Sequence, residues 1–210
     1  MEFPGAYAET GVFVCFEGGE GAGKSTQSGL LSEWLAGEGR EVVLTREPGA
    51  TAVGKELRRL VLSPATGALD DKTEALLYAA DRAEHVAAVV RPALARGAVV
   101  ITDRYVDSSL AYQGAGRSLD VADVERISRW ATGDLRPHLT VVLDLAPSEG
   151  LGRFEERDRI EGESVEFHTR VREAFLRMAH TDTTHYLVLD ARAPINEIHA
   201  AIVARLKELL

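Results

Sequence analysis

The chain has 210 residues, 45% of them hydrophobic and 27% charged, which is typical of one globular domain with a well-buried core. Its 33 Asp and Glu residues outnumber its 24 Lys and Arg residues, giving a net charge of −9. This balance argues against a general surface for nucleic acid or for anionic membranes. Any anionic ligand must therefore be held by a local cluster of basic residues.

The N-terminal residues and the single cysteine favour a cytoplasmic protein. Residues 1–11, which we expect to form an N-terminal extension, contain no Lys or Arg and no long apolar core, unlike a secretion signal. No apolar run approaches the roughly 18 residues that a membrane span needs. Cys15 lies within an apolar run, so we expect a small buried side chain and no intrachain disulfide.

Five short runs rich in Val, Ile and Leu recur along the chain, and most of them lack polar alternation. Such runs are typical of strands that helices cover on both faces. The expected strands are residues 12–16, 41–45, 98–102, 140–145 and 186–190.

Helical patterns lie between these runs, and several close near a glycine. The expected helices are residues 24–36, 73–95, 121–131 and 195–210. Alternating strands and helices predict an α/β fold, with a doubly wound five-stranded parallel sheet and helices on both faces. Ligands should bind at the carboxyl ends of the strands. Because no repeat or flexible linker divides the chain, we expect residues 1–210 to form a single domain.

The stretch directly after the first expected strand matches the phosphate-binding loop pattern G-x-x-x-x-G-K-[ST]. Its glycines let successive N–H groups turn toward one anion, and the next helix adds the positive end of its dipole. Lys24 should reach the β- and γ-phosphates of a nucleotide, and the Ser25 hydroxyl should ligate Mg²⁺. The loop comprises Gly18, Gly19, Glu20, Gly21, Ala22, Gly23, Lys24, Ser25 and Thr26. A plain glycine-rich turn is the alternative, but the strand, the spacing, the lysine and the serine all match.

Polar residues also follow two other expected strands. Asp103, at the end of the third, can hold Mg²⁺ directly or through water, and the planar fork of Arg104 suits a phosphate. Residues 46–49 follow the second strand and could bind ligand or simply form a turn. Arg58 and Arg59, further on, could equally belong to a solvated helix face.

Two later segments carry groups that could recognise a ligand. Tyr78 precedes Arg82 by four residues, so both project from one helix face and could meet a planar base, although a core tyrosine and a surface arginine is the simpler interpretation. Residues 153–161 are charged and flanked by glycines. Kinases commonly supply an arginine from a mobile segment, so we expect a short helical lid over about residues 150–162, with a solvated surface as the alternative.

The ordered motifs together closely resemble bacterial thymidylate kinases, a family of phosphate-loop nucleoside monophosphate kinases. The likeness runs from about Val12 to the C-terminus, and it rests on EGGEGAGKST at 17–26, TREPG at 45–49, DRY at 103–105, DSSLAYQG at 107–114 and DRIE at 158–161. The resemblance implies transfer of the γ-phosphoryl group of ATP to dTMP, with Mg²⁺, by a homodimer.

At the base end, the resemblance assigns Tyr78 to stacking on thymine, where the family usually has Phe. Arg82 would bond the thymine O4, and Ser109 and Gln113 would lie near the base and its N3. Tyr112 would crowd C2′ and disfavour ribonucleotides.

At the phosphate end, the resemblance places Glu20 against the sugar 3′-hydroxyl of dTMP. Arg104 would hold the acceptor phosphate, together with Arg46 and Arg58, and Glu47 belongs to the same motif as Arg46.

The family also divides by the position of its catalytic arginine. The loop between Gly18 and Gly23 contains no arginine, whereas the lid contains Arg153, Arg157 and Arg159. The chain therefore resembles the members whose catalytic arginine lies in the lid.

Two alternatives remain open from the sequence. Another deoxynucleotide kinase or a deoxynucleoside kinase would share the loop. A nucleoside kinase phosphorylates an uncharged hydroxyl and needs a general base to activate it. Arg104, which suits a phosphate, argues against a nucleoside kinase. A non-catalytic phosphate-loop switch would need only the loop and Mg²⁺. A guanine-reading Asn-Lys-x-Asp run would favour a switch, and the chain has none.

Overall fold

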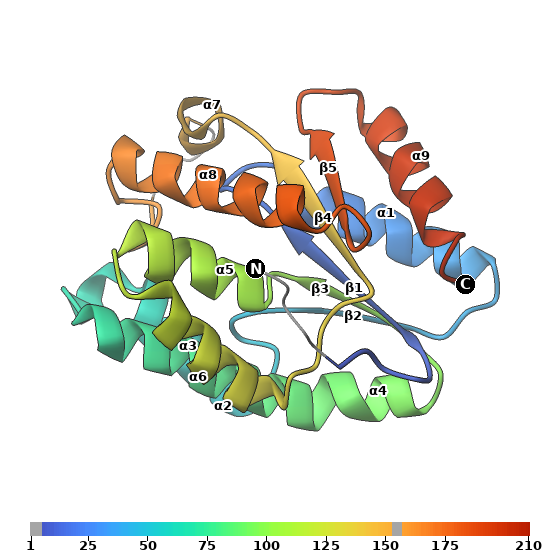
Figure 1. Ribbon diagram of the computed structural model, residues 1–210, viewed down its shortest axis with the longest axis horizontal. Helices are drawn as coiled ribbons and strands as arrows, with labels where there is room; N and C mark the ends of the chain where they lie inside the picture. Colours follow the sequence, from blue (N-terminus) through green and yellow to red (C-terminus); the bar gives the residue numbers. More distant parts are fainter. Residues whose placement is uncertain (1–5, 153–156) are drawn as a thin grey trace.

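A five-stranded, all-parallel sheet forms the centre of the computed structural model, which describes residues 6–152 and 157–210 (Figure 1). The strand order is β2-β3-β1-β4-β5. The strands are β1 (Val12–Glu17), β2 (Val42–Arg46), β3 (Val99–Asp103), β4 (Leu139–Asp144) and β5 (Tyr186–Asp190). Each lies within one residue of its predicted bounds, so the expected doubly wound parallel sheet is confirmed.

Helices connect the strands. They are α1 (Lys24–Gly37), α2 (Ala52–Leu62), α3 (Asp71–His85), α4 (Arg91–Ala95), α5 (Val106–Ser109), α6 (Val121–Thr132), α7 (Pro147–Leu151), α8 (Val165–Thr181) and α9 (Ile195–Leu206), with a short 3₁₀ turn η1 (Pro64–Thr66). The predicted helices at 24–36, 121–131 and 195–210 are present, although α9 ends at Leu206. Helices α2, α5, α7 and α8 were not predicted. Within the described part of the expected helical lid, α7 ends at Leu151 and residues 157–162 contain turns rather than helix.

Two π-helical segments interrupt the regular helices. The predicted helix at 73–95 is continuous in the structure, but η2 (Val86–Val90) widens it between α3 and α4. Pro92 in α4 has no N–H to bond to the preceding turn, and the N–H of Arg91 bonds to the carbonyl of Val86 in the wider π pattern. The second segment, η3 (Leu110–Gly116), continues α5, which begins just after the carboxyl end of β3.

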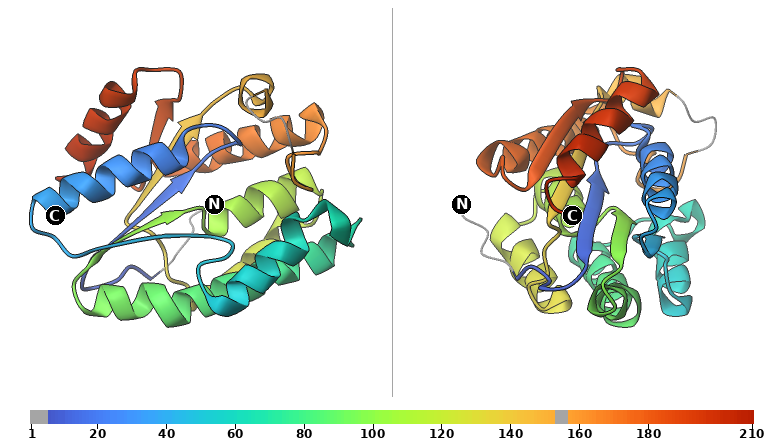
Figure 2. Two further views of the ribbon diagram at one scale, coloured as in Figure 1. Left: turned by 180° about the vertical axis from the view of Figure 1, so that it is seen from behind. Right: turned by 90° about the vertical axis from the view of Figure 1, so that its right-hand side faces the viewer.

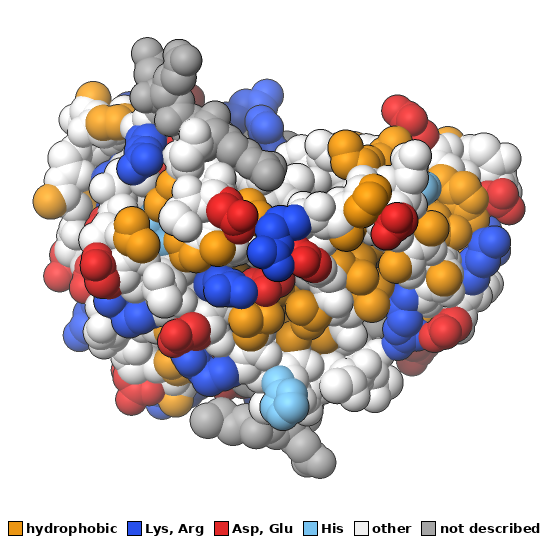
Figure 3. All heavy atoms as spheres, turned by 90° about the horizontal axis from the view of Figure 1, so that it is seen from above, with side chains coloured by type: hydrophobic (Ala, Val, Ile, Leu, Met, Phe, Trp, Pro, Cys, Tyr) orange, Lys and Arg blue, Asp and Glu red, His pale blue; other side chains and the backbone are white. Residues whose placement is uncertain are grey.

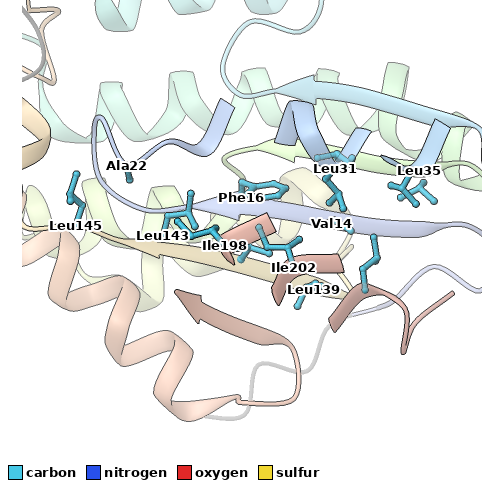
Figure 4. Close-up of a cluster of buried hydrophobic side chains, with 14 residues drawn as sticks. Val14, Phe16, Ala22, Leu31, Leu35, Leu139, Leu143, Leu145, Ile198 and Ile202 are labelled. Atoms are coloured by element: carbon cyan, nitrogen blue, oxygen red, sulfur yellow. The ribbon is translucent and has the colours of Figure 1, made fainter. Parts of the chain in front are cut away.

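Apolar side chains fill both faces of the sheet. Helices α1 and α9 cover one face, where Leu31, Ile198 and Ile202 pack against Phe16 (Figure 4). The right-hand view of Figure 2 shows α1 and α8 on opposite sides of β1. On the other face, Cys15 belongs to a second cluster of buried side chains, with Phe13 and Val100. Cys15 is 1% exposed, as expected for a small buried side chain.

The surface mixes charges of both signs. On the face drawn in Figure 3, basic and acidic side chains lie side by side rather than in separate patches. Arg172 pairs with Asp144, and Arg192 pairs with Asp190, at the ends of β4 and β5. Among the described residues, no helix is long and apolar enough to cross a membrane.

Candidate active site

The phosphate-binding loop joins β1 to α1 through glycines in conformations that other residues rarely adopt. Gly18, Gly21 and Gly23 have φ angles of 130°, 68° and 91°. A Cβ on Gly18 would overlap the carbonyl oxygen of Leu143, so the loop also needs glycine there for space. Residues 20–26 line a cavity of about 900 Å³, into which the N-terminus of α1 opens.

Lys24 places a buried positive charge inside this loop. Its Nζ donates hydrogen bonds to the carbonyls of Gly18 at 3.1 Å and Gly19 at 2.8 Å, and the residue is only 7% exposed. Burial lowers the pKa of the ammonium because desolvation disfavours its charged form. A phosphate in the cavity would restore a counter-charge to this group.

Ser25 and Asp103 bring two oxygen ligands together at the carboxyl edge of the sheet. Ser25 Oγ donates to Asp103 Oδ2 at 3.0 Å, while the buried Asp103 Oδ1 has no hydrogen-bond partner in the described structure. A hydroxyl beside a carboxylate oxygen that lacks a partner fits a hard cation such as Mg²⁺, which otherwise keeps water and phosphate oxygens as ligands.

Glu20 forms the junction between the loop and the rest of the site. Its Oε1 accepts hydrogen bonds from Arg104 Nη2 at 2.6 Å and from the Tyr112 hydroxyl at 2.9 Å. Burial alone would raise the pKa of Glu20, but the positive charges of Arg104 and Lys24 outweigh burial and lower that pKa to about 2. Arg104 also donates to the Gly18 carbonyl at 3.2 Å, so both partners are fixed in place.

A second cavity, of about 620 Å³, opens on the other side of Glu20. It is lined, among others, by Tyr78, Arg82, Arg104, Ser109, Tyr112 and Gln113. Arg82 is 2% exposed and donates to Glu47 Oε2 at 2.7 Å, to Ser109 Oγ at 2.9 Å and to the Tyr105 carbonyl at 2.9 Å. The structure thus joins Tyr78, Arg82, Ser109 and Gln113 around one volume, although they come from α3, α5 and η3.

Comparison with known proteins identifies one family along nearly the whole chain. The family model for thymidylate kinase matches residues 16–202. The chain is 52% identical over 200 residues to a thymidylate kinase of Cutibacterium acnes, covering 95% of this chain and 98% of that protein. It is 54% identical over 200 residues to a thymidylate kinase of Leifsonia xyli, covering 93% and 94%.

The chain belongs to the thymidylate kinase family. A solved thymidylate kinase from Ehrlichia chaffeensis shares its fold, with a TM-score of 0.76 and 31% identity over 94% of this chain and 99% of that one. The sequence resemblance to bacterial thymidylate kinases is therefore confirmed.

The two cavities of this thymidylate kinase family member share part of their walls. Glu20, Glu47, Arg58 and Arg104 line both of them. Arg58 donates to the Pro48 carbonyl at 3.0 Å. Of these two cavities, the exposed Arg46 lines the one at the phosphate loop. Arg58 and Arg104 therefore lie where the two cavities join.

The structure describes two of the three arginines predicted for the lid. Arg153 falls outside the described residues. Arg157 is exposed and donates to the Leu151 carbonyl at 3.3 Å. Arg159 instead donates to the Val61 carbonyl at 2.8 Å and forms an ion pair with Glu74. Neither Arg157 nor Arg159 lines the cavity of the phosphate loop.

Two residues that organise the site had no predicted role. Glu17, at the end of β1, is fully buried and accepts hydrogen bonds from the N–H groups of Tyr105 at 2.9 Å and Ser108 at 3.1 Å, which shape the chain after Arg104. His85 Nδ1 contacts Glu47 Oε1 at 2.8 Å and holds it against Arg82. A charged residue ending an apolar strand could have signalled Glu17, whereas His85 had no such signal.

Proposed function

We propose that residues 1–210 form one kinase domain that transfers the γ-phosphoryl group of ATP to dTMP, giving dTDP and ADP, with residues 150–162 as its lid. The observation that carries the proposal is that Glu20 and Arg104 line both cavities. One cavity offers a phosphate loop, and the other offers an aromatic ring beside polar groups suited to a base. The relatives described above are thymidylate kinases, which supports dTMP as the acceptor.

The chemistry needs no general base. The phosphate of a nucleoside monophosphate has a second pKa of about 6, taking phosphoserine as a guide, so its oxygen is already a nucleophile at neutral pH. The protein must instead bring two anions together and neutralise their charge. Lys24 would hold the donor phosphates, and Arg104, with Arg46 and Arg58, would hold the acceptor phosphate between the cavities.

The second cavity would hold the thymidine part of dTMP. Tyr78 would stack on thymine, and Arg82, which keeps two of its five N–H groups free of described partners, would donate to O4. Ser109 lies beside Arg82 at the base, and Tyr112 would exclude a 2′-hydroxyl. Glu20, held between Tyr112 and Arg104, would accept a hydrogen bond from the sugar 3′-hydroxyl.

Mg²⁺ belongs to the same proposal. Ser25 and Asp103 would hold it, directly or through water, and it would neutralise charge on the donor phosphates. The partnerless Asp103 Oδ1 supports this assignment.

The proposal also includes a homodimer. Helix α3 lies beside α2 and α6 (Figure 1). Each of the three helices exposes a large apolar side chain, Val53 on α2 at 53%, Leu76 on α3 at 55% and Trp130 on α6 at 85%. A second copy would cover such a surface. Analytical ultracentrifugation should show a dimer that Leu76→Glu weakens, and a monomer in the unchanged protein would contradict this part.

A panel of acceptors tests the activity. ADP release should be measured with dTMP, dUMP, UMP, dCMP and thymidine, each with ATP and Mg²⁺. We expect strong preference for dTMP, with some activity on dUMP because one methyl group contributes only about 1–3 kcal/mol. No turnover of dTMP at any ATP concentration would overturn the proposal, and preference for thymidine would indicate a nucleoside kinase.

A further inference from the structure

A buried carboxylate contacts a residue that lines the second cavity, and the proposed function gives this carboxylate no role. Glu74, in the first turn of α3, is 1% exposed. Its Oε1 accepts hydrogen bonds from Gln113 Nε2 at 2.9 Å and Arg117 Nε at 3.2 Å. Its Oε2 accepts from Arg117 Nη2 at 3.1 Å and from Arg159. Three segments that are distant in sequence therefore meet on one side chain.

Glu74 is held in its charged form. Burial alone would raise its pKa, but the hydrogen bonds from Arg117, Gln113 and Arg159 outweigh burial and lower that pKa. An ionised carboxylate has no hydrogen to donate, so it can face only donors. Glu74 therefore imposes an orientation on any amide group beside it.

The amide beside it is that of Gln113, which also lines the cavity. Because only the Nε2 end can bond to Glu74, the Oε1 end is turned away from the carboxylate. No described residue donates a hydrogen bond to Oε1. An amide normally exchanges its two ends at little cost, but here exchange would set oxygen against a buried negative charge.

We propose that Glu74 is a positioning residue for base recognition, which fixes Gln113 as a hydrogen-bond acceptor toward the base and so selects against cytosine. The inference rests on the proposed function. Thymine and uracil present an N–H at N3 and an acceptor at O4, which match Gln113 Oε1 and the free N–H groups of Arg82. Cytosine presents the reverse, an acceptor at N3 and an amino group at C4.

The variant Glu74→Gln tests this role because it reverses the orientation. Arg117 and Arg159 would donate hydrogen bonds to the single oxygen of the new amide, so its NH₂ group would point toward Gln113. Gln113 would then turn its oxygen to that NH₂ and present a donor to the base. We expect the ratio of kcat/KM for dTMP to that for dCMP to fall about tenfold or more, while the ratio for dTMP to dUMP stays within about twofold. The KM for ATP should not change.

Glu163→Gln is the matched control. It removes one charge from the same cluster, where Glu163 pairs with Arg117, but it does not contact Gln113. Both ratios should remain those of the unchanged protein. If thermal unfolding shows that Glu74→Gln is not folded, Glu74→Asp keeps the charge and withdraws it from Gln113, and its dTMP to dCMP ratio should also fall.

Two results would overturn the proposal. One is an unchanged dTMP to dCMP ratio in a folded variant. The other is a loss of activity on dTMP, dUMP and dCMP by the same factor, which would mean that Glu74 only supports the structure. Both are distinct from failure of the proposed function, because that failure appears as absence of dTMP turnover in the unchanged protein.

Discussion

The hydroxyl of Tyr112 donates a hydrogen bond to Glu20 Oε1 at 2.9 Å, which ties η3 to the phosphate-binding loop. The ring of Tyr112 also lies under the guanidinium of Arg104, 4.9 Å from its centre. Glu20 therefore depends on one neutral and one charged donor for its position. The contact between Tyr112 and Glu20 lies where the two cavities meet. Its geometry should therefore affect the use of dTMP, the phosphoryl acceptor, more than the use of ATP, the phosphoryl donor.

Tyr112→Phe should weaken use of dTMP and leave use of ATP unchanged. The variant keeps the ring but removes one of the two donors to Glu20, and a hydrogen bond to a charged group is worth about 1.5–3 kcal/mol. Steady-state kinetics should show kcat/KM for dTMP falling about 10- to 100-fold, with the same KM for ATP. Tyr7→Phe, which removes a hydroxyl outside both cavities, is the control. Equal kcat/KM values in the two variants would show that the Tyr112–Glu20 contact has no role.

Asp103→Asn should increase the Mg²⁺ requirement. The variant keeps the shape of the side chain and its contact with Ser25 but removes the negative charge, and Mg²⁺ prefers carboxylate ligands. Activity measured against free Mg²⁺ should reach half-maximum at a concentration at least about tenfold higher. An unchanged Mg²⁺ dependence would exclude Asp103 from the metal site, and chelation of Mg²⁺ should abolish activity in both proteins.

The lid arginines should fall into two classes. Arg153→Ala and Arg157→Ala should lower kcat more than they change the KM for dTMP, by about 100-fold or more for the arginine that meets the transferring phosphate. Arg159→Ala should act differently, since Arg159 is bound to Glu74 and the Val61 carbonyl, and should mainly raise the KM for dTMP. If all three variants keep the kcat of the unchanged protein, the lid does not supply the catalytic arginine.

Gly150→Ala should disturb the phosphate-binding loop from outside. Gly150 lies in α7, and a Cβ there would overlap the carbonyl oxygen of Glu20. Because the contact is with backbone, the loop must shift, and overpacking of this kind costs about 1–3 kcal/mol. Calorimetry should show a Tm lower by several degrees, and kcat/KM should fall for both ATP and dTMP.

Gly29→Ala in α1 is the control. A Cβ at this position meets nothing within 4 Å, so the substitution should slightly stabilise the protein. Equal Tm values would contradict the close contact.

Glu17→Gln should change how stability depends on pH. Burial, with the nearby charge of Asp107, raises the pKa of Glu17 from 4.5 to about 7. The folded protein then binds this proton more tightly than the unfolded chain, so the contribution of Glu17 to stability is complete below about pH 4.5 and is lost as the pH rises to about 7. Relative to the variant, the free energy of unfolding of the unchanged protein should fall by about 2–3 kcal/mol over this interval.

Urea unfolding of both proteins at pH 4.5 and pH 7.5 measures this difference. Comparing the two proteins removes the effect of other titrating groups. Glu9→Gln, which alters an exposed carboxylate, should run parallel to the unchanged protein. Parallel behaviour of Glu17→Gln would mean that burial does not perturb this carboxyl.

Local sequence patterns predicted the sheet and the phosphate-binding loop because each depends on residues that are adjacent in the chain. Apolar runs of five or six residues mark strands covered on both faces, and the spacing of Gly18, Gly23 and Lys24 marks the loop. Helix α8 follows a similar local rule, with Ser164 as its N-cap and Phe167, Val171 and Phe175 one turn apart, so the sequence carried a signal for it that our prediction did not use.

The partners inside the site depended on the tertiary structure. The sequence by itself determined the fold class and the phosphate loop, because both depend on residues that are neighbours in the chain. It could not show that Arg82 meets Glu47, or that Arg159 meets Glu74 rather than the phosphate loop, because these pairs lie 35 and 85 residues apart. Such contacts follow from which strands pair and which helices pack together, and only the folded chain brings those charges within reach of each other.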